Sequence, residues 1–388
     1  MKCKLSDICG FRKGKVDVSN LTLKTYISTE NMLPNKGGIT VASYLPTVQL
    51  TQEYKKGDVL VSNIRPYFKK IWRAKNDGGC SNDVLVFQGN SNIDGDFLYY
   101  ILANDDFFAY SMATSKGTKM PRGDKTSIMQ YEVPIFDIDT QRKIASVLRS
   151  LDEKIELNSA INNNLLEQLD QLYAEFSSRS EWSEMTIGDI ADKVAMGPFG
   201  SNIKVSTFVE YGVPIISGNH LRGYFLEEPS YNYITEEHAE KLKNSVVYPK
   251  DIVFTHAGNI GQVAMIPDGC EFPYYVLSQR QFYLRCNTEL AVPEYVLLFF
   301  HSKIGQHELL SYANQTGVPS IAQPATNLKK IRLPIPPLDE QKDWLLVVAP
   351  IIKMYQNNYQ ETKKLAELRD TLLPKLMSGD IDVSEVDI

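Results

Sequence analysis

Residues 133–143 read VPIFDIDTQRK, and residues 333–343 read LPIPPLDEQKD. The two stretches share proline, isoleucine, aspartate and glutamine at numbers that differ by two hundred, as in Gln141 and Gln341. Such self-similarity indicates an internal repeat. Each stretch opens a long segment whose apolar residues recur alternately every four and three positions, which predicts a long helix of the coiled-coil type in each half.

The apolar stripes of the two predicted helices are in register with each other. We expect them to meet in an antiparallel seam, with Asn158 and Asn358 in or beside one buried polar layer that sacrifices stability and fixes register. The alternative is that these turns are simply exposed. The predicted seam residues are Leu148, Leu151, Ile155, Asn158, Leu165, Leu169, Leu172, Val348, Ile351, Tyr355, Asn358, Leu365 and Leu372.

The helix ends are predicted from capping residues and prolines. Asp139 or Thr140 can cap the first helix and Asp339 the second, because their side-chain oxygens can accept from the free amides of a first turn. Pro350 is expected to kink or split the second helix, and Pro374 to end it about a turn early.

The repeat extends to the start of each half, since KLSDI at residues 4–8 is echoed by TIGDI at residues 186–190. KKGDVLVSNI at residues 55–64 is likewise echoed by YPKDIVFTHA at residues 248–257, and both read as a turn that feeds a strand. The predicted class is therefore α+β, with two pseudo-symmetric mixed α/β domains separated by two long antiparallel helices. We expect mixed domains at 1–138 and 181–337, helices at 139–178 and 338–379, and an acidic tail at 380–388.

Composition sets further bounds. The chain has 388 residues, of which 43% are hydrophobic and 23% are charged, which suffices for two ordinary cores. Its five cysteines have no C-x-x-C spacing, so neither a zinc site nor a disulfide framework is indicated. The N-terminal sequence lacks the apolar core of a signal peptide, and no run of apolar residues is long enough to span a membrane. We therefore expect a soluble, cytoplasmic protein that binds no metal.

The formal net charge is −6, but the charge is unevenly distributed. Between residues 51 and 75, seven basic residues face only Glu53 and Asp58, and a second basic cluster lies at residues 116–125. Much of the acidic charge falls on the first predicted helix and on the tail. Basic domains on an acidic scaffold suit a DNA-binding protein, although ordinary solvated charge is the simpler alternative.

Basic and polar residues in the predicted loops are candidates for DNA contacts. The glycine-rich residues 197–204 could offer amides to a phosphate but lack the Lys-Ser/Thr ending of a nucleotide-binding loop, and an ordinary turn remains an alternative. Residues 217–224 and 255–262 offer side chains that can hydrogen-bond base edges. The candidates are Arg65, Lys69, Lys70, Lys116, Lys119, Arg122, Gly197, Phe199, Ser201, Asn202, Lys204, Asn219, His220, Arg222, His256, Asn259 and Gln262.

Catalytic motifs are missing from the sequence. There is no Asn/Asp-Pro-Pro-aromatic methyltransferase motif, no glycine-rich loop placed to hold S-adenosylmethionine, and no GKT or GKS for ATP. We therefore expect a chain that is not itself an enzyme.

The order of domain, helix, domain and helix resembles the specificity subunit of Type I restriction-modification enzymes. The phrases that carry the resemblance are VSNIRPYFKKI at residues 61–71, GTKMPR at 117–122, GPFGSNIK at 197–204 and LPIPPLDEQ at 333–341. None of these phrases is specific alone, but their order and duplication are.

The resemblance implies two target recognition domains, each reading half of a split site in double-stranded DNA, in a system of host defence. It also implies that the antiparallel helices bind two methyltransferase subunits, through which the restriction and translocation subunits join. S-adenosylmethionine, ATP and magnesium would then belong to those partners, and this chain would hold no cofactor. A stand-alone DNA-binding or interaction adaptor without methyltransferase partners is the alternative.

Overall fold

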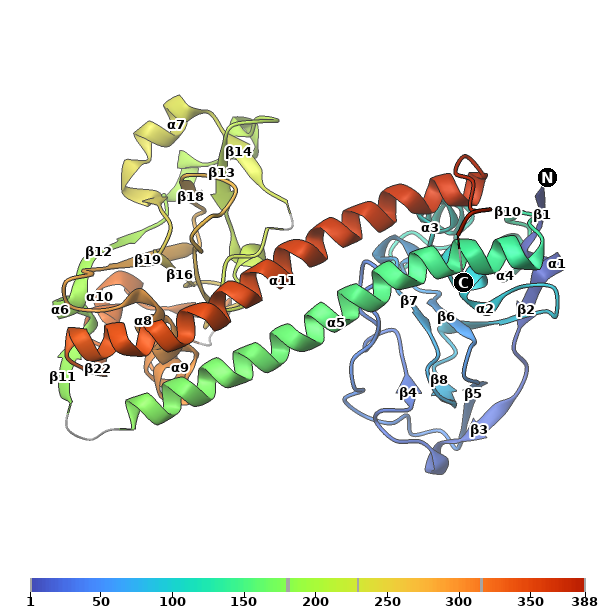
Figure 1. Ribbon diagram of the computed structural model, residues 1–388, viewed down its shortest axis with the longest axis horizontal. Coiled ribbons are helices and arrows are strands. Elements are labelled where there is room, and N and C mark those ends of the chain that lie inside the picture. The colour runs from blue at the N-terminus through green and yellow to red at the C-terminus, as the bar shows by residue number, and fades with distance from the viewer. Residues whose placement is uncertain (1, 179–181, 229, 315–316, 387–388) are drawn as a thin grey trace. The chain divides into compact units, whose positions relative to one another are not determined.

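The computed structural model describes residues 2–178, 182–228, 230–314 and 317–386, so the predicted domain boundary at 181 and the last two residues of the predicted tail lie outside the described residues. The chain divides into two compact units, Met1–Asn158 with Glu361–Ile388, and Ser159–Gln360. Each unit contains part of both long helices, α5 (Ile138–Ser177) and α11 (Leu338–Ser378), which are green and red in Figure 1.

The first unit is built on two four-stranded sheets, with strand orders β2-β9-β6-β7 and β3-β5-β8-β4, and a two-stranded pair β1-β10. Its strands are β1 (Lys2–Lys4), β2 (Cys9–Phe11), β3 (Lys15–Asp17), β4 (Tyr26–Ile27), β5 (Leu50–Tyr54), β6 (Val59–Ser62), β7 (Ile71–Arg73), β8 (Gly78–Cys80), β9 (Val84–Gly89) and β10 (Glu132–Pro134). Its short helices are α1 (Leu5–Ile8), α2 (Gly95–Ala103), α3 (Asp105–Ala113) and α4 (Lys125–Ile128).

The second unit repeats the first sheet as β12-β19-β16-β17, and also contains the sheet β14-β13-β18-β15 and the pairs β11-β22 and β20-β21. Its strands are β11 (Ser183–Thr186), β12 (Ala191–Met196), β13 (Val213–Ile216), β14 (Asn232–Ile234), β15 (Val246–Val247), β16 (Ile252–Thr255), β17 (Val263–Met265), β18 (Tyr275–Leu277), β19 (Gln281–Cys286), β20 (Ala313–Asn314), β21 (Ser320–Ile321) and β22 (Arg332–Ile335). Its short helices are α6 (Ile187–Ile190), α7 (Glu236–Lys241), α8 (Pro293–His301), α9 (Lys303–Leu310) and α10 (Pro324–Leu328).

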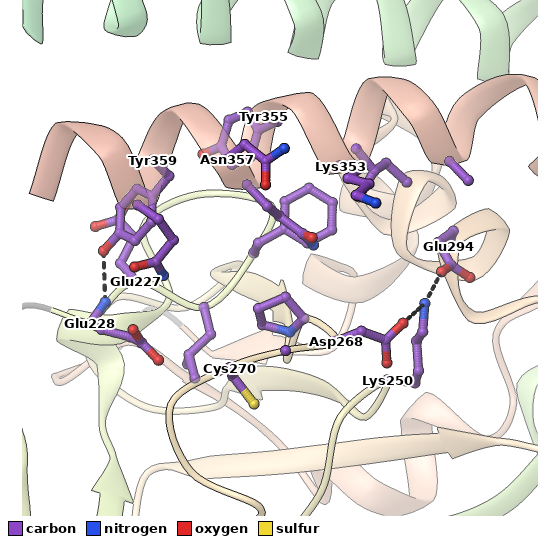
Figure 2. Close-up of a pocket in the computed structure, with 18 residues that line it drawn as sticks. Glu227, Glu228, Lys250, Asp268, Cys270, Glu294, Lys353, Tyr355, Asn357 and Tyr359 are labelled. Atoms are coloured by element: carbon purple, nitrogen blue, oxygen red, sulfur yellow. Dashed lines mark hydrogen bonds and ion pairs between the residues drawn. The ribbon is translucent and has the colours of Figure 1, made fainter. Parts of the chain in front are cut away.

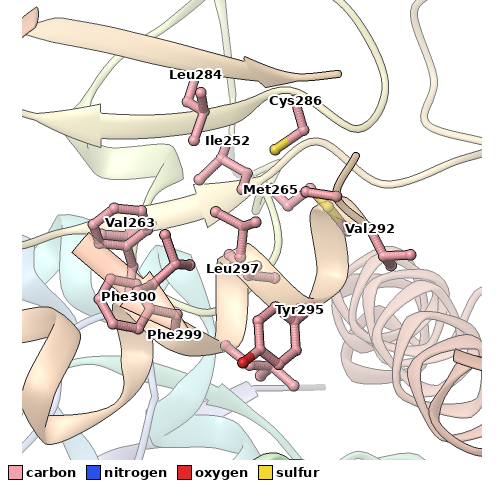
Figure 3. Close-up of a cluster of buried hydrophobic side chains, with 14 of the residues drawn as sticks. Ile252, Val263, Met265, Leu284, Cys286, Val292, Tyr295, Leu297, Phe299 and Phe300 are labelled. Carbon is pink, nitrogen blue, oxygen red and sulfur yellow. The ribbon is translucent and has the colours of Figure 1, made fainter. Parts of the chain in front are cut away.

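The main core of each unit lies between the repeated sheet, one short helix and the long helices. In the second unit, Figure 3 shows Ile252, Val263 and Leu284 of the sheet facing Leu297 and Phe300 of α8. The same cluster includes side chains of α5 and α11, such as Phe176 and Trp344. In the first unit, the corresponding cluster joins the sheet and α2 to Ile144, Leu148, Leu373 and Leu376. Burial of apolar surface therefore fastens each mixed domain to the helices.

The two long helices run antiparallel within each unit. In the first unit, Arg369 Nη1 contacts Asp152 Oδ1 at 2.8 Å, and Asn158 Nδ2 donates to Glu361 Oε2 at 2.8 Å. In the second unit, Asn358 Nδ2 donates to Asn162 Oδ1 at 3.0 Å and Trp344 Nε1 to the carbonyl of Leu172 at 3.4 Å. Asn158 and Asn358 thus each bond across the helix pair to a different polar partner. All thirteen predicted seam residues are buried or half-buried.

The predicted helix caps are wrong. Helix α5 begins at Ile138, and the carboxylate of Asp137 accepts from the backbone amides of Asp139 and Thr140 at 3.1 and 2.9 Å. Helix α11 begins at Leu338, which places Asp339 inside the first turn. In the first turn, the negative charge of Asp339 interacts favourably with the positive end of the helix dipole.

The predicted effects of the two prolines on helix length are also wrong, because Pro350 and Pro374 both lie inside the continuous helix α11. Each proline removes one backbone hydrogen bond and leaves the carbonyl four residues earlier without its partner. Pro350 and Pro374 are exposed, as are Leu346 and Asp370 at those earlier positions. Water can therefore bond to the freed carbonyls, and α11 continues past both prolines.

The repeated glutamines connect each long helix to its mixed domain. Gln141 Oε1 accepts from the amide of Asp94 at 2.9 Å, while its Nε2 donates to the carbonyls of Phe136 and Asn92 at 2.9 and 3.3 Å. Gln341, fully buried, makes the same three bonds, with the amide of Val292 at 2.8 Å and the carbonyls of Pro336 and Leu290 at 2.8 and 3.1 Å. Each glutamine thus satisfies backbone groups of a loop about fifty residues before it.

Replacing Gln341 with leucine (Gln341→Leu) is expected to lower the free energy of unfolding by about 3 kcal/mol or more, because three backbone groups, two of them in buried bonds, lose their partner. Urea denaturation measures the change. The matched control is Gln360→Leu on the same helix, where the side chain is exposed and the stability should stay within about 0.5 kcal/mol of the parent. Equal stability of the two variants would contradict the anchoring role of Gln341.

Candidate nucleic-acid interface

Three loops of the first unit are fastened together at one end of its repeated sheet. They are the β6–β7 connection (residues 63–70), the turn at 81–83 and the hairpin at 116–122, which we call the first loop cluster. Antiparallel bridges join Arg122 to both Ile64 and Lys116. The backbone bonds run from Asn63 N to Asp83 O at 2.8 Å, from Arg65 N to Pro121 O at 2.8 Å and from Gly123 N to Asn63 O at 3.2 Å.

The second unit repeats this arrangement bond for bond. Its loop cluster comprises the β16–β17 connection (residues 256–262), the turn at 278–280 and the β20–β21 hairpin. A bridge joins Ala257 to Ser320, as Ile64 is joined to Arg122. The backbone bonds run from His256 N to Arg280 O at 2.9 Å, from Gly258 N to Pro319 O at 2.9 Å and from Ile321 N to His256 O at 2.8 Å.

Arg65 and Gly258 occupy the same place in the two clusters, and both have a left-handed backbone, with φ of 50° and 89°. Glycine adopts this conformation without steric cost, whereas a residue with a Cβ is strained in it by about 1 kcal/mol or more. Strained backbone tends to collect at functional sites. The strain at Arg65 therefore marks the β6–β7 connection as a candidate contact surface.

Two of the predicted DNA-binding lysines are bonded inside the first unit. Lys69 Nζ contacts Asp105 Oδ2 at 2.7 Å, and Lys70 Nζ donates to the carbonyl of Thr29 at 2.6 Å. Burial lowers the pKa of Lys70. Arg65 is half-buried, and its amide donates to the carbonyl of Pro121 in the hairpin. Lys69 and Lys70 therefore hold the loop in place in this structure.

The predicted cations of the hairpin are more accessible. Lys116, Lys119 and Arg122 are all exposed. Lys116 Nζ contacts Asp124 Oδ2 at 2.5 Å, and Arg122 Nη2 contacts Asp83 Oδ1 at 3.1 Å, so each is tied to a surface carboxylate. Surface ion pairs of this kind are weak and can exchange for phosphate contacts. The hairpin is thus the most accessible basic element of the first loop cluster.

The glycine-rich loop of the second unit has a structural role at its start. Gly197 is buried, its amide donates to the carbonyl of Gln281 at 2.8 Å, and a Cβ there would lie 2.0 Å from the carbonyl oxygen of Ser278. We therefore remove Gly197 from the DNA-binding candidates. Phe199 is 73% exposed, and Asn202 and Lys204 are also exposed. The side chain of Ser201 lies outside what the structure describes.

His220 is also removed from the candidates, because its side chain is only 3% exposed. Nδ1 accepts from the amide of Ser217 at 2.9 Å, so Nε2 donates to the carbonyl of Ser230 at 2.9 Å. The ring stacks on Tyr231 at 4.6 Å, and burial lowers the pKa of His220. Both ring nitrogens of His220 therefore already have hydrogen-bond partners inside the second unit.

The other polar candidates of the second unit lie in or beside the loop cluster. Asn259 is exposed, and His256 Nε2 contacts the carbonyl of Gln279 at 3.2 Å. Gln262 Oε1 accepts from Thr255 Oγ1 at 3.1 Å. A Cβ at Gly218 would lie 3.1 Å from Gln262 Oε1, so the exposed Asn219 belongs to the same surface.

Arg222 is exposed but lies in the segment that leads away from the cluster toward α11. Burial raises the pKa of nearby Glu227, and the charge of Arg222 opposes that rise. A Cβ at Gly223 would lie 3.3 Å from Glu227 Oε1 and 3.4 Å from the Tyr355 hydroxyl on the helix.

Sequence reasoning missed Arg280. Arg280 lies in the turn directly before β19, and its carbonyl accepts from the amide of His256. The side chain is exposed, and its Nη1 lies 3.5 Å from where a Cβ of Gly258 would be. A comparison of the two turns before the repeated strands could have drawn attention to it, since Asp83 stands in the matching place.

A cavity of about 500 Å³ lies elsewhere in the second unit, between α11 and the loops at 225–228 and 267–270 (Figure 2). Lys250 Nζ contacts Asp268 Oδ2 at 2.7 Å and pairs with Glu294, while the Tyr359 hydroxyl accepts from the amide of Glu228 at 2.8 Å. The Tyr359 bond joins the mixed domain to α11 beside the cavity, whereas the Lys250 pairs lie within the mixed domain.

Within the described part of the chain, no group of three His, Cys, Asp or Glu side chains could hold a metal ion. None of the helices in the described residues is long and apolar enough to cross a membrane.

A family model described as "Type I restriction modification DNA specificity domain" matches residues 1–167 and again 179–368. The chain belongs to this family. The two matches fall on the two halves of the repeat. Specificity subunits are the non-catalytic members of Type I restriction-modification complexes, and they determine which DNA target is recognised.

Curated relatives agree with the family match. The chain is 24% identical over 343 residues to the Type I restriction enzyme MjaIX specificity subunit of Methanocaldococcus jannaschii, a match that covers 79% of this chain and 74% of the relative. It is 32% identical over 176 residues to the HindI specificity subunit of Haemophilus influenzae, which covers 43% and 38% of the two chains.

The fold is similar to the crystal structure of the Type I S subunit from M. genitalium, with a TM-score of 0.59 and 17% identity over 97% of this chain and 96% of that one. The predicted α+β class, with two mixed domains and two long helices packed together, is therefore confirmed.

Proposed function

We propose that this specificity subunit reads a two-part site in double-stranded DNA, with one recognition domain at residues 1–138 and the other at 181–337. The observation that carries the proposal is the loop cluster built twice with the same three backbone bonds. Each copy presents different side chains on the same framework. A shared framework with different side chains suits the reading of two different sequences, because phosphate contacts position a protein and base-edge contacts specify the sequence.

We further propose that two methyltransferase subunits bind the long helices and that the restriction subunits join through them. Helix α11 supports this, because Leu346, Val347 and Met354 expose 75%, 57% and 52% of their surface although they are apolar. Exposed apolar patches commonly mark protein interfaces. S-adenosylmethionine, ATP and magnesium would be held by the partners, and the complex would act on DNA in the cytoplasm.

Co-expression with the methyltransferase subunit tests the partner assignment. We expect a stable complex with two methyltransferase copies for each specificity subunit, measured by light scattering, and sequence-specific methylation by that complex. The Leu346→Asp variant should weaken the complex, because a carboxylate would replace an apolar contact. The adaptor alternative would be favoured instead if the purified chain bound DNA but never a methyltransferase.

A further inference from the structure

We propose that Arg280 is the DNA-contacting cation of the second recognition domain, in a cluster where the first domain carries its cation on the hairpin at Arg122. The inference rests on the proposed function and names one residue of the surface that would recognise DNA.

The backbone hydrogen bonds and bridges show which positions of the two loop clusters correspond to each other. The amide of Asn63 donates to Asp83, and the amide of His256 donates to Arg280, so Asp83 and Arg280 are structural counterparts. Ile64 is bridged to Arg122, and Ala257 is bridged to Ser320, so Arg122 and Ser320 are counterparts as well.

The two clusters distribute their charge differently. In the first, Arg122 on the hairpin contacts Asp83 on the turn at 3.1 Å. In the second, the hairpin position holds the neutral Ser320, and the turn holds Arg280. A positive charge is therefore present at the junction of turn and hairpin in both domains, but it comes from opposite sides of that junction.

Arg280 differs from its neighbour Arg285 in how its charge is used. Arg285 Nη2 contacts Asp251 Oδ2 at 2.6 Å, and that carboxylate is buried. The charge of Arg285 therefore compensates a buried negative charge. Among the described residues, no carboxylate oxygen forms an ion pair with Arg280, whose guanidinium lies beside Gly258. Because glycine has no side chain, the exposed guanidinium can lie against the loop backbone without a steric clash.

The chemistry of a guanidinium identifies what Arg280 would bind. Its planar fork matches two acceptors at once, which on DNA are either two phosphate oxygens or O6 and N7 of guanine. Asn219 and Asn259 are also exposed and can hydrogen-bond base edges or phosphates. The second loop cluster thus offers one cation flanked by neutral polar groups.

The test uses the full specificity subunit in complex with its methyltransferase and measures affinity for the native site over a range of salt concentrations. Arg280→Gln is expected to weaken binding about tenfold or more. If the contact is to a phosphate, the variant should reduce the salt slope by about 0.9 and weaken all sequences equally. If the contact is to guanine, the variant should instead lose sequence preference at one position of the second half-site. Either pattern supports the inference.

Two further variants sharpen the result. Lys329→Gln removes an exposed charge on the same unit, next to α10, and should leave affinity and salt slope unchanged. The double variant Arg280→Gln with Ser320→Arg returns the cation to the hairpin side and should recover part of the salt slope. If Arg280→Gln binds like the parent while the parent binds DNA specifically, the inference is overturned. A parent complex that shows no specific binding would instead overturn the proposed function.

Discussion

A fragment of residues 1–178, supplied with the methyltransferase subunit, is expected to direct methylation of a symmetric site made of two inverted copies of the first half-site. The expectation rests on matched packing in the two units. Ile144 and Leu148 share a core cluster with Leu373 and Leu376 of α11. In the second unit, Tyr173 and Phe176 of α5, two hundred positions before Leu373 and Leu376, share a cluster with Trp344 and Val348, two hundred positions after Ile144 and Leu148.

Two copies of α5 can therefore supply both sides of an antiparallel seam, as a two-fold dimer requires. Tyr173 and Phe176 of one copy would pack on Ile144 and Leu148 of the other. The aromatic rings are larger than the leucines they replace, but Ile144 is smaller than Trp344, so the volumes largely offset. Volume-conserving exchanges of this kind are well tolerated in cores.

The measurement is a map of the methylated bases in the DNA of host cells that produce the fragment and the methyltransferase subunit. Replacing Leu151, Leu165 and Leu172 by aspartate should abolish the dimer and the methylation, because unpaired carboxylates would face one another in the seam. The matched control is Leu157→Asp at an exposed position of the same helix, which should leave the dimer intact. A monomeric fragment that still methylates the original asymmetric site would contradict the two-fold seam.

The second large effect is expected from Val348→Asp, which should lower the free energy of unfolding by more than about 4 kcal/mol. Val348 is fully buried in the core that joins α11 to the second recognition domain. An aspartate there would be an unpaired charge in an apolar cluster. Denaturation in urea measures the loss.

Leu346→Asp, two residues away on the same helix, is the matched control because Leu346 is 75% exposed. Its stability should match that of the parent, even though we expect it to bind the methyltransferase less well. Similar destabilisation by both variants would show that the seam is not where the structure places it.

The repeat could be predicted from the sequence, and the class of the fold with it, because the glutamine motifs and the apolar stripes depend only on local spacing. The role of the glutamines could not. Gln141 and Gln341 bond to carbonyls of Asn92 and Leu290, and nothing in the sequence links those positions.

Other expectations failed because sequence alone does not report exposure. Pro350 and Pro374 were expected to split or shorten α11, yet both face solvent and the helix continues past them. His220 carries the right chemistry for a base contact, but it is buried among backbone groups.

Equal spacing in the sequence does not by itself show that two loop residues are structural counterparts. Gly117 and Gly317 differ by two hundred positions, like the glutamines. Bridges pair Lys116 with Arg122 and Asn314 with Ser320, so Gly117 is the first residue after its strand position and Gly317 the third. The two glycines are therefore not counterparts, and the match between them is a coincidence of numbering.

The central claim is that one chain reads two separated pieces of DNA. Helix α5 has 40 residues, which at about 1.5 Å per residue makes a rod of roughly 60 Å, whereas DNA repeats every ~34 to 36 Å. Mapping methylated bases in host DNA with and without this chain tests the claim most directly. The account predicts a motif of two specified parts, about one to one and a half helical turns apart from centre to centre, with unread bases between them. A continuous motif shorter than about six base pairs would contradict it.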